Sequence, residues 1–256
     1  MNLSGNSSNA DGEFPPAGKK ITSKKMGSFL DSILDIFFPS LCIKCGKGIS
    51  GRETICIPCF ENIPINKSLF CGKCGARLPY GKKICHFDFP YILGAATTYK
   101  DEVARDLVRE LKFGFIKNAA GPLAKLLISY SENIGFIEND WVVVPIPLGA
   151  NRLRKRGFNQ ATLIAEIFAE HFSLIVEKEG FIRHKETRPQ SEMENYESRL
   201  ENARDCFKIT APEKFSGRNI ILIDDVSTSG VTFFEAASSL KKSGAKKIIA
   251  LAAVKG

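Results

Sequence analysis

Hydrophobic residues follow two alternating patterns from about residue 92 to the end of the chain. Strands that are buried on both faces are indicated by short continuous apolar runs at 92–98, 141–146, 220–223 and 247–254. Amphipathic helices are predicted where apolar residues recur every three or four positions, at 100–112, 119–130, 161–172 and 233–242. Strands that alternate with helices favour an α/β fold with a mostly parallel sheet flanked by helices.

The strand predicted at 220–223 is followed by two adjacent acids, Asp224 and Asp225, and then by a loop rich in hydroxyl groups. Open α/β sheets bind ligands beyond the carboxyl ends of their strands, so we expect both carboxylates there. Carboxylates accept hydrogen bonds from sugar hydroxyls, while hydroxyl groups and a helix N-terminus suit one phosphate. The candidate phosphate contacts are Ser227, Thr228, Ser229, Gly230 and Thr232. An ordinary turn with an Asp cap is the alternative, but a cap needs neither two acids nor four hydroxyls.

A second polar segment follows the strand predicted at 141–146. It is a glycine-containing loop with four basic residues, which leads into the helix predicted at 161–172. The basic residues are Arg152, Arg154, Lys155 and Arg156. Arg156 precedes Gly157, which would let its side chain approach an anion closely. The cluster therefore indicates a second anion contact, and the alternative is a solvated run of charge.

Seven of the eight cysteines lie between residues 42 and 85, and their spacing repeats after 29 residues. Cys42, Cys45, Cys56 and Cys59 form two CxxC pairs that can complete a tetrahedron around Zn²⁺. Disulfides are the alternative, but the chain has no secretion signal and the short knuckle spacing favours metal. The first set of four cysteines therefore predicts a zinc ribbon.

The second repeat contains Cys71, Cys74 and Cys85, with Asp88 in the position of the fourth cysteine. Aspartate can ligate zinc, and His86 is a competing fourth ligand. The second site is therefore expected to be altered, weaker or empty. A segment this short buries little core, so metal would supply most of its folding free energy.

The first 28 residues are rich in Ser, Asn, Gly and Pro and lack the apolar centre of a signal peptide. We expect a flexible tail there, with Met26 as a candidate start, and a cytoplasmic protein. The following apolar segment, 29–38, contains two aspartates and is shorter than the roughly 20 residues of a membrane span. The net charge of +8 is partly explained by the tail and by the cluster at 152–156. A polyphosphate ligand would therefore account for some of the basic excess without nucleic acid.

Several segments carry a resemblance to a known family. Residues 220–232 resemble the thirteen-residue signature of type I phosphoribosyltransferases, which bind phosphoribosyl pyrophosphate. Residues 145–160 contain a PxP…RGFNQ segment before a helix. Together with the double ribbon, these features resemble the ComF family from about residue 29 to the end. The resemblance also covers Tyr99, the triplet Leu111-Lys112-Phe113, and the set Arg183, Thr187, Gln190, Arg199, Asn202 and Phe207.

The ComF resemblance implies three parts: a tail at 1–28, an opening helix with a double zinc ribbon at 29–90, and a phosphoribosyltransferase-like domain at 91–256. It implies that residues 148–157 are the pyrophosphate loop and residues 183–202 a hood over the substrate. Asp224 and Asp225 would position the ribose hydroxyls, with Mg²⁺ on the pyrophosphate. Further substrate contacts would be Arg152, Arg156, Gly157, Arg183, Gln190 and Arg199. Because the family's second ribbon normally ends in CxxC, Asp88 is a departure.

Two functions of different classes remain open. The protein is either a phosphoribosyltransferase with an unidentified acceptor, or a protein of the DNA-uptake machinery that handles single-stranded DNA and has a regulatory nucleotide site. The intact signature favours the first for ligand binding. The aromatic residues of 42–88 are scattered, so they do not form the stacking stripe that is typical of single-strand binding.

Overall fold

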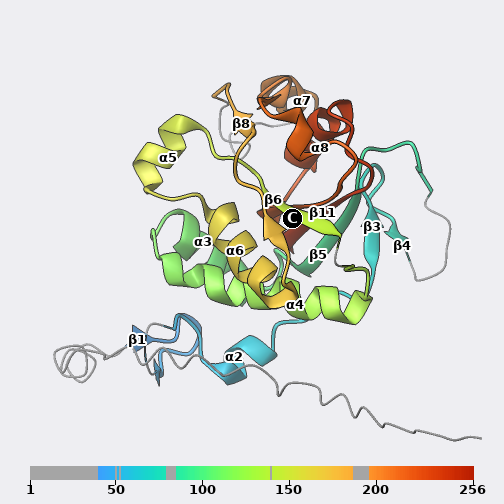
Figure 1. Cartoon of the computed structure of the whole chain (residues 1–256). Coiled ribbons are helices and arrows are strands. Elements are labelled where there is room, and N and C mark those ends of the chain that lie inside the picture. The colour runs from blue at the N-terminus through green and yellow to red at the C-terminus, as the bar shows by residue number, and fades with distance from the viewer. Residues whose placement is uncertain (1–39, 50, 52, 79–84, 139, 187–195) are drawn as a thin grey trace, which may run out of the picture. The chain divides into compact units, whose positions relative to one another are not determined.

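The structure, a computed structural model, describes residues 40–49, 51, 53–78, 85–138, 140–186 and 196–256. Its main element is a seven-stranded sheet in the order β4-β3-β5-β11-β10-β6-β7 (Figure 1). The strands are β3 (Leu69–Cys71), β4 (Arg77–Leu78), β5 (Ile92–Thr98), β6 (Trp141–Pro145), β7 (Ile175–Val176), β10 (Asn219–Ser227) and β11 (Ile248–Lys255). The five strands from β5 to β7 in this order run parallel to one another. The mostly parallel sheet that the sequence predicted is therefore confirmed.

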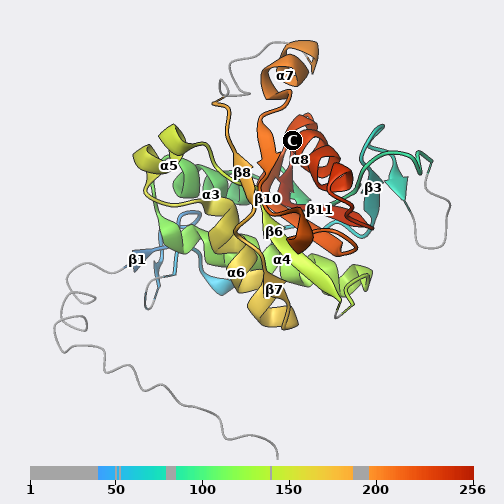
Figure 2. The same cartoon turned by 45° about the horizontal axis from the view of Figure 1, so that its top comes forward.

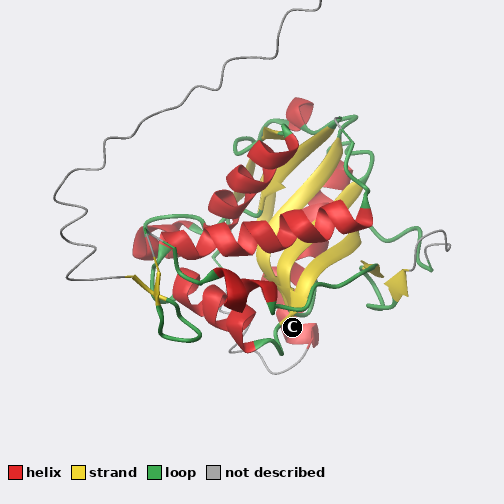
Figure 3. Ribbon diagram, turned by 90° about the horizontal axis from the view of Figure 1, so that it is seen from below, coloured by secondary structure: helices red, strands yellow, loops and turns green. Residues whose placement is uncertain are grey.

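Helices flank this sheet, as Figures 2 and 3 show. The helices that contact its strands are α4 (Ala120–Ile134), α6 (Gln160–Phe172) and α8 (Val231–Lys242). α3 (Glu102–Lys112) packs on α4, α7 (Tyr196–Ala203) packs on α8, and α5 (Ala150–Arg156) follows β6 in the chain, with 3₁₀ turns at Lys117–Ala119 and Pro212–Lys214. Successive side chains of the central strand β10 point to opposite faces. Ile221 and Ile223 therefore pack with α3, α4 and α6, whereas Ile220 and Leu222 pack with α8.

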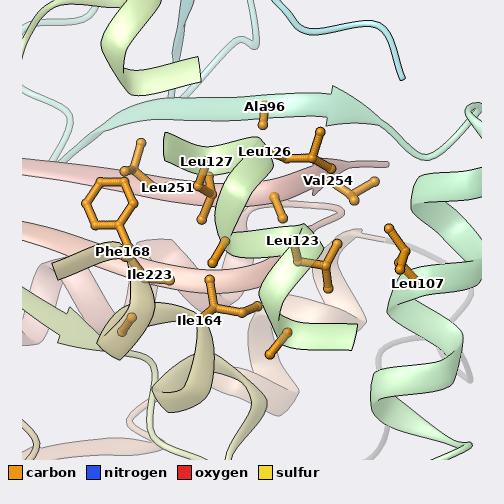
Figure 4. Packing of buried hydrophobic residues seen from close by; sticks show 14 of the residues in the cluster. Ala96, Leu107, Leu123, Leu126, Leu127, Ile164, Phe168, Ile223, Leu251 and Val254 are labelled. Atoms are coloured by element: carbon orange, nitrogen blue, oxygen red, sulfur yellow. The ribbon is translucent and has the colours of Figure 1, made fainter. Parts of the chain in front are cut away.

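The face that carries α4 and α6 holds the larger of the two hydrophobic clusters. Figure 4 shows Ile223 and Leu251 of the sheet against Leu123 and Leu127 of α4, with Phe168 of α6 alongside. These side chains are fully buried or nearly so. Truncation of such a residue to alanine typically costs about 2–5 kcal/mol, so this cluster fixes the sheet that carries the acidic pair.

Two elements differ from the sequence-based expectation in this region. β10 continues to Ser227, so Asp224 and Asp225 lie within the last part of the strand and not after it. Asp224 is still paired with Ala252, and Ser227 with Lys255, because β11 extends equally far. The expected loop at 148–157 contains the short helix α5, since its alanine, leucine, lysine and arginine residues favour helix and Gly157, at φ 76°, ends it.

The two ribbons are built differently. The first forms its own hairpin, β1 (Ser40–Leu41) with β2 (Gly48–Ile49), followed by α2 (Ile57–Glu61). The second contributes β3 and β4 to the main sheet, where β3 runs antiparallel to β5. β5 follows the boundary predicted at residue 90 almost directly, so main-chain hydrogen bonds join the second ribbon to the segment after that boundary.

A separate hairpin lies in the expected hood region. It pairs β8 (Phe181–Arg183) with β9 (Phe207–Ile209), and α7 precedes β9 in the chain. Gln190, which the ComF resemblance places among the substrate contacts, lies outside the described residues. The opening helix expected from residue 29 also lies outside them. No helix in the described ranges combines the length and apolar character that crossing a membrane requires.

Candidate functional site

The acid pair, Asp224 and Asp225, lies on β10 between β11 and β6, near the carboxyl ends of these strands. Asp225 is 1% exposed, and its Oδ2 lies 3.0 Å from Nζ of Lys112 at the end of α3. Among the described residues, neither carboxylate oxygen of Asp225 has a hydrogen-bond partner with good geometry. The Lys112 ammonium is thus the counter-ion of a buried carboxylate.

Asp224 is the partly exposed member of the pair. Its Oδ1 accepts a hydrogen bond from the backbone N–H of Asp225 at 2.9 Å. Desolvation raises the pKa of Asp224 to about 8, the negative charge of Asp225 adds to the rise, and Lys112 opposes it. Two carboxylates this close favour a shared cation or shared hydroxyl donors, as a sugar or a hydrated metal ion would supply.

The hydroxyl loop, Ser227–Gly230, connects the acid pair to α8. Ser227 is buried, and Ser229 Oγ is buried without a hydrogen-bond partner in the described chain. Gly230 caps α8 at φ 76°, and a Cβ there would lie 2.8 Å from Oη of Tyr91. A buried hydroxyl without a partner, next to the amino end of a twelve-residue helix, fits the oxygen atoms of a phosphate.

The basic residues of α5 divide into two groups. Arg156 is half-buried and donates a hydrogen bond to Oε1 of Gln160. Burial lowers the pKa of Arg156, and attraction to Asp225 and Asp224 partly offsets this effect. Arg154 and Lys155 are exposed, with Arg154 donating to Asn151. Arg156 is therefore a predicted anion contact whose charge acts on the acid pair, and Arg152, also on α5, is partly exposed.

Asn159 fixes the segment that follows α5. Its side chain accepts a hydrogen bond from the backbone N–H of Ala161, which caps α6, and its Nδ2 donates to the carbonyl of Ile146 at 2.9 Å. Lys117 lies over the neighbouring Phe158 ring, with 5.5 Å between Nζ and the ring centroid. These contacts join the end of β6 to the start of α6 and hold Arg156 near the sheet.

Arg183 and Arg199 are hood residues predicted to bind substrate. Arg183 lies on β8 with its guanidinium carbon 5.3 Å from the Phe207 ring centroid, so its stacking partner is part of the hairpin. The side chain of Arg199 lies outside the described residues. The hood also supplies Glu186, which the sequence did not single out. Its Oε1 accepts a 2.8 Å hydrogen bond from the backbone N–H of Asn151 at the start of α5.

Lys112 is the residue that sequence reasoning did not assign to the site. It appeared only within the triplet Leu111-Lys112-Phe113, and nothing in its own neighbourhood points to an acidic partner so far along the chain. Tyr91 is a second such residue, since its Oη donates toward the carbonyl of Gly230 at 3.2 Å. Both come from elements that precede the basic segment and the hydroxyl loop.

The first cysteine cluster brings Cys42, Cys45, Cys56 and Cys59 together, with all four sulfur atoms within 4.8 Å of one another. Cys45 Sγ and Cys56 Sγ are 3.8 Å apart. A tetrahedral zinc ion with Zn–S bonds of about 2.3 Å separates its sulfur ligands by about 3.8 Å. Burial raises the pKa of Cys42, but backbone N–H groups of Cys45, Cys56 and Lys44 prevail and lower it to about 6. The donor set therefore fits Zn²⁺.

The second cluster contains Cys71, Cys74, Cys85 and His86, and Asp88 is outside it. His86 Nδ1 lies 3.4 Å from Cys71 Sγ, close to the roughly 3.6 Å edge expected between nitrogen and sulfur ligands of zinc. The structure therefore places the competing ligand His86, and not Asp88, with the three thiols. All eight cysteines are free thiols, so the disulfide alternative is not adopted.

Two hollows in the described surface lie away from the acid pair. One of about 470 Å³ is lined by residues of the first ribbon and α4, including Ile57 and Lys125. Another of about 580 Å³ lies between the end of the second ribbon and α8, at Phe87 and Phe234. Neither of these two hollows is lined by the acid pair or the hydroxyl loop.

Comparison with known proteins gives two family matches and several relatives. The chain matches the phosphoribosyl transferase domain over residues 116–256 and the double zinc ribbon domain over residues 33–87. Competence protein F of Haemophilus influenzae is 26% identical over 226 residues, which cover 83% of this chain and 95% of that protein. DNA utilization protein YhgH of Escherichia coli K12 is 24% identical over 212 residues, 81% and 87% of the two chains. Competence protein ComFC of Bacillus subtilis is 37% identical over 110 residues, 42% and 41% of the two chains.

Proposed function

The chain belongs to the phosphoribosyltransferase domain family and carries a double zinc ribbon ahead of that domain; from this we propose that it binds phosphoribosyl pyrophosphate with Mg²⁺ and transfers the phosphoribosyl group to an acceptor. The observation that carries the proposal is the acid pair on β10, which leads directly into the hydroxyl loop and α8. This order offers hydroxyl acceptors and a phosphate cradle on one continuous segment.

In the proposed complex, the hydroxyl loop binds the 5-phosphate. The unpaired Oγ of Ser229 and the amino end of α8 donate toward its oxygen atoms, and Gly230 lets the backbone come close. Asp224 and Asp225 accept hydrogen bonds from the ribose hydroxyls. Because the strand fixes both carboxylates, the sugar is oriented with little loss of side-chain freedom.

Departure of pyrophosphate leaves positive charge on the ribose and negative charge on the leaving group. Arg156 would hold the leaving group, and its electrostatic interaction with the acid pair supports this role. The carboxylates are oxygen ligands of the kind that Mg²⁺ prefers, and two of them need substrate phosphates to complete a shell. When bound, Mg²⁺ would neutralise part of the negative charge of the diphosphate.

Ligand binding is tested by calorimetry and thermal unfolding of the full-length protein with phosphoribosyl pyrophosphate and Mg²⁺. Saturation at a hundred times the dissociation constant should stabilise the protein by about 2.7 kcal/mol. The double variant Asp224→Asn, Asp225→Asn should lose most of that shift. The matched control removes two exposed charges, Glu201→Gln and Glu213→Gln, and should keep it. An equal response in both double variants would refute the assignment, and pyrophosphate release with a panel of bases and amines would identify the acceptor.

We extend the proposal to the ribbons, where each cluster would hold one zinc ion. Its support is the ligand spacing of both clusters, whose four donor atoms lie within 4.8 Å of one another in each case. Free thiols of this kind are stable in a reducing compartment, which favours the cytoplasm. Metal analysis of the purified protein should give two zinc ions per chain.

A role in DNA uptake is the second candidate, because relatives of this chain are named competence proteins and a DNA utilization protein. One surface observation favours it. Phe113 and Phe115, which follow α3, are 71% and 45% exposed, and Arg154 and Lys155 of α5 are exposed. Exposed rings and exposed basic side chains are the two kinds of group that bind single strands by stacking and charge.

A salt-dependent titration with a single-stranded oligonucleotide tests this second role. Binding should weaken steeply with salt. Arg154→Gln with Lys155→Gln should reduce the slope of log K against the logarithm of the salt concentration by about 1 or more. The acid-pair double variant should bind the oligonucleotide as the parent does. Binding that is insensitive to salt and to both α5 substitutions would exclude this surface.

A further inference from the structure

The ion pair between Lys112 and Asp225 has no part in the chemistry described so far. Nζ lies 3.0 Å from Oδ2, and the two side chains are 24% and 1% exposed. Solvent reaches neither oxygen of Asp225. A ligand that is to bind Asp225 must therefore meet Lys112 first, because the ammonium already occupies the carboxylate.

The position of Lys112 is built into the fold. Asp101 caps the start of α3 by accepting a 2.8 Å hydrogen bond from Ala104, and the fully buried Leu107 and Leu111 anchor the helix in the core. The last residue of α3 is thereby held against β10. Lys112 precedes the region that matches the phosphoribosyl transferase domain, residues 116–256. The cation at the acid pair thus comes from the segment ahead of the matched domain.

A carboxylate removed from water is stable only while a cation accompanies it. Arg156 also acts on Asp225, but its guanidinium is engaged with Gln160. In the described part of the chain, the Lys112 ammonium contacts Asp225 and no second acceptor, and its flexible stem allows it to change partners. A ligand can therefore displace Lys112 from this ion pair more easily than it could displace a cation with several fixed partners.

Resting on the proposed function, we propose that Lys112 is a binding residue of the phosphoribosyl site, which holds the place of a divalent cation at Asp225 until ligand arrives. On binding, Asp225 accepts hydrogen bonds from the ribose hydroxyls, and the Lys112 ammonium moves to an anionic oxygen of the diphosphate. The divalent cation that enters with the diphosphate would then neutralise Asp225 in place of the ammonium, so this buried carboxylate keeps a positive partner before and after binding. The ligand-free site then has little affinity for a free divalent cation, so the cation enters with the diphosphate.

Two binding measurements on the full-length, zinc-loaded protein test this exchange. Lys112→Met removes the charge and keeps the chain length, Lys112→Arg keeps the charge, and Lys246→Met removes an exposed charge elsewhere. Without sugar phosphate, Mn²⁺ followed by electron paramagnetic resonance should bind Lys112→Met about tenfold more tightly than the parent. With Mg²⁺, phosphoribosyl pyrophosphate should bind Lys112→Met about tenfold more weakly, a loss of about 1.4 kcal/mol. Lys112→Arg should stay within about threefold of the parent, and Lys246→Met should equal it.

Lys112→Met should raise the affinity for Mn²⁺ and lower the affinity for phosphoribosyl pyrophosphate. A merely structural change would not move the two affinities in opposite directions. Unchanged affinity for either ligand in Lys112→Met overturns the inference. If Lys112→Met does not fold, the ¹⁵Nζ resonance of Lys112 in the parent, assigned with Lys112→Arg, must shift when phosphoribosyl pyrophosphate and Mg²⁺ are added; a constant resonance overturns the inference. A parent that binds no phosphoribosyl pyrophosphate refutes the proposed function, whereas the Mn²⁺ measurement still decides whether Lys112 blocks the carboxylate.

Discussion

The two ribbons share a 29-residue spacing of their ligands but differ in how they join the rest of the chain. The first has its own hairpin, contributes Cys42 and Ile55 to the hydrophobic cluster that contains α3 and α4, and forms exposed ion pairs with these helices, Lys44–Glu102 and Lys125–Glu53. Exposed pairs contribute about 0–1 kcal/mol. The second adds two strands to the main sheet through main-chain hydrogen bonds between β3 and β5. The same ligand spacing thus occurs once in a ribbon outside the main sheet and once in a ribbon whose strands belong to that sheet.

The second ribbon also reaches the hydroxyl loop. Gly72 lies between the ligands Cys71 and Cys74, and a Cβ there would lie 2.7 Å from the carbonyl oxygen of Tyr91. The Tyr91 hydroxyl lies 3.5 Å from the carbonyl oxygen of Gly72 and 3.2 Å from that of Gly230. A single side chain therefore connects a metal knuckle to the start of α8. Loss of the second metal should disturb the candidate phosphate site, whereas loss of the first should not.

The largest effect is expected from removing one exposed thiol of each ribbon, at positions that correspond in the repeat. Cys74→Ser and Cys45→Ser should each release most of one zinc ion, since a structural site contributes on the order of 10 kcal/mol to folding. Only Cys74→Ser should also lower the unfolding temperature of the sheet domain and shrink the shift caused by phosphoribosyl pyrophosphate. Zinc content and thermal unfolding with and without ligand measure both. Equal ligand responses in the two variants would show that the ribbons are equivalent for the site.

The next effect separates the two candidate ligands of the second ribbon. His86→Ala should lose the second zinc ion, because it leaves only three thiols, whereas Asp88→Ala should retain it. Removal of a zinc ligand should raise the rate of metal loss to a chelator about tenfold or more, by analogy with supporting groups that alone cost 10–100-fold. A chromogenic chelator follows the release. Faster loss from Asp88→Ala than from His86→Ala would contradict the arrangement of the four donors.

Most of the fold was predicted from local patterns of hydrophobic and polar residues. The strand expected at 92–98 is β5, and the one expected from residue 141 is β6, because a buried strand between helices has a distinctive apolar run. The acid pair and hydroxyl loop were also readable, since the whole segment is continuous in the chain. The helix at 150–156 was missed because the glycines and charges around it resemble a loop, although its own residues favour helix.

The remaining differences concern contacts that no local pattern contains. Lys112 and Asp225 meet because α3 packs beside β10, and neither neighbourhood indicates the other. The 29-residue repeat pointed to Asp88 because it assumes that both ribbons turn alike, but the turn after Cys85 places His86 with the thiols. Tyr91 likewise joins two segments that are distant in sequence. Such contacts depend on tertiary packing, which spacing alone does not determine.

A pH experiment tests the acid pair independently of either ribbon. The folded-state pKa of Asp224, about 8, lies above its value of 3.8 in the unfolded chain, so the folded protein binds this proton more tightly. Ionisation of Asp224 therefore costs stability, increasingly from about pH 4 to about pH 8. Asp224→Asn should be more stable than the parent at about pH 8.5 by about 1 kcal/mol or more, and less so at about pH 5.5. Denaturant unfolding measures the gain, with the surface variant Asp106→Asn as control; a gain that is constant with pH would refute this origin.

The smallest effect is expected at the hydroxyl that joins the second ribbon to the hydroxyl loop. Tyr91→Phe keeps the ring, which packs against Phe89 and Phe233, and removes the hydroxyl that contacts Gly72 and Gly230. A net hydrogen bond contributes about 1 kcal/mol, so affinity for phosphoribosyl pyrophosphate should fall about fivefold. Tyr130→Phe is the matched control, because it also loses a buried hydroxyl contact, 2.8 Å to the carbonyl of Ser68, but does not touch the loop. Calorimetry should show lower affinity in Tyr91→Phe alone; equal affinities in both variants would mean that the metal knuckle acts on the site through β3 and β5 and not through this tyrosine.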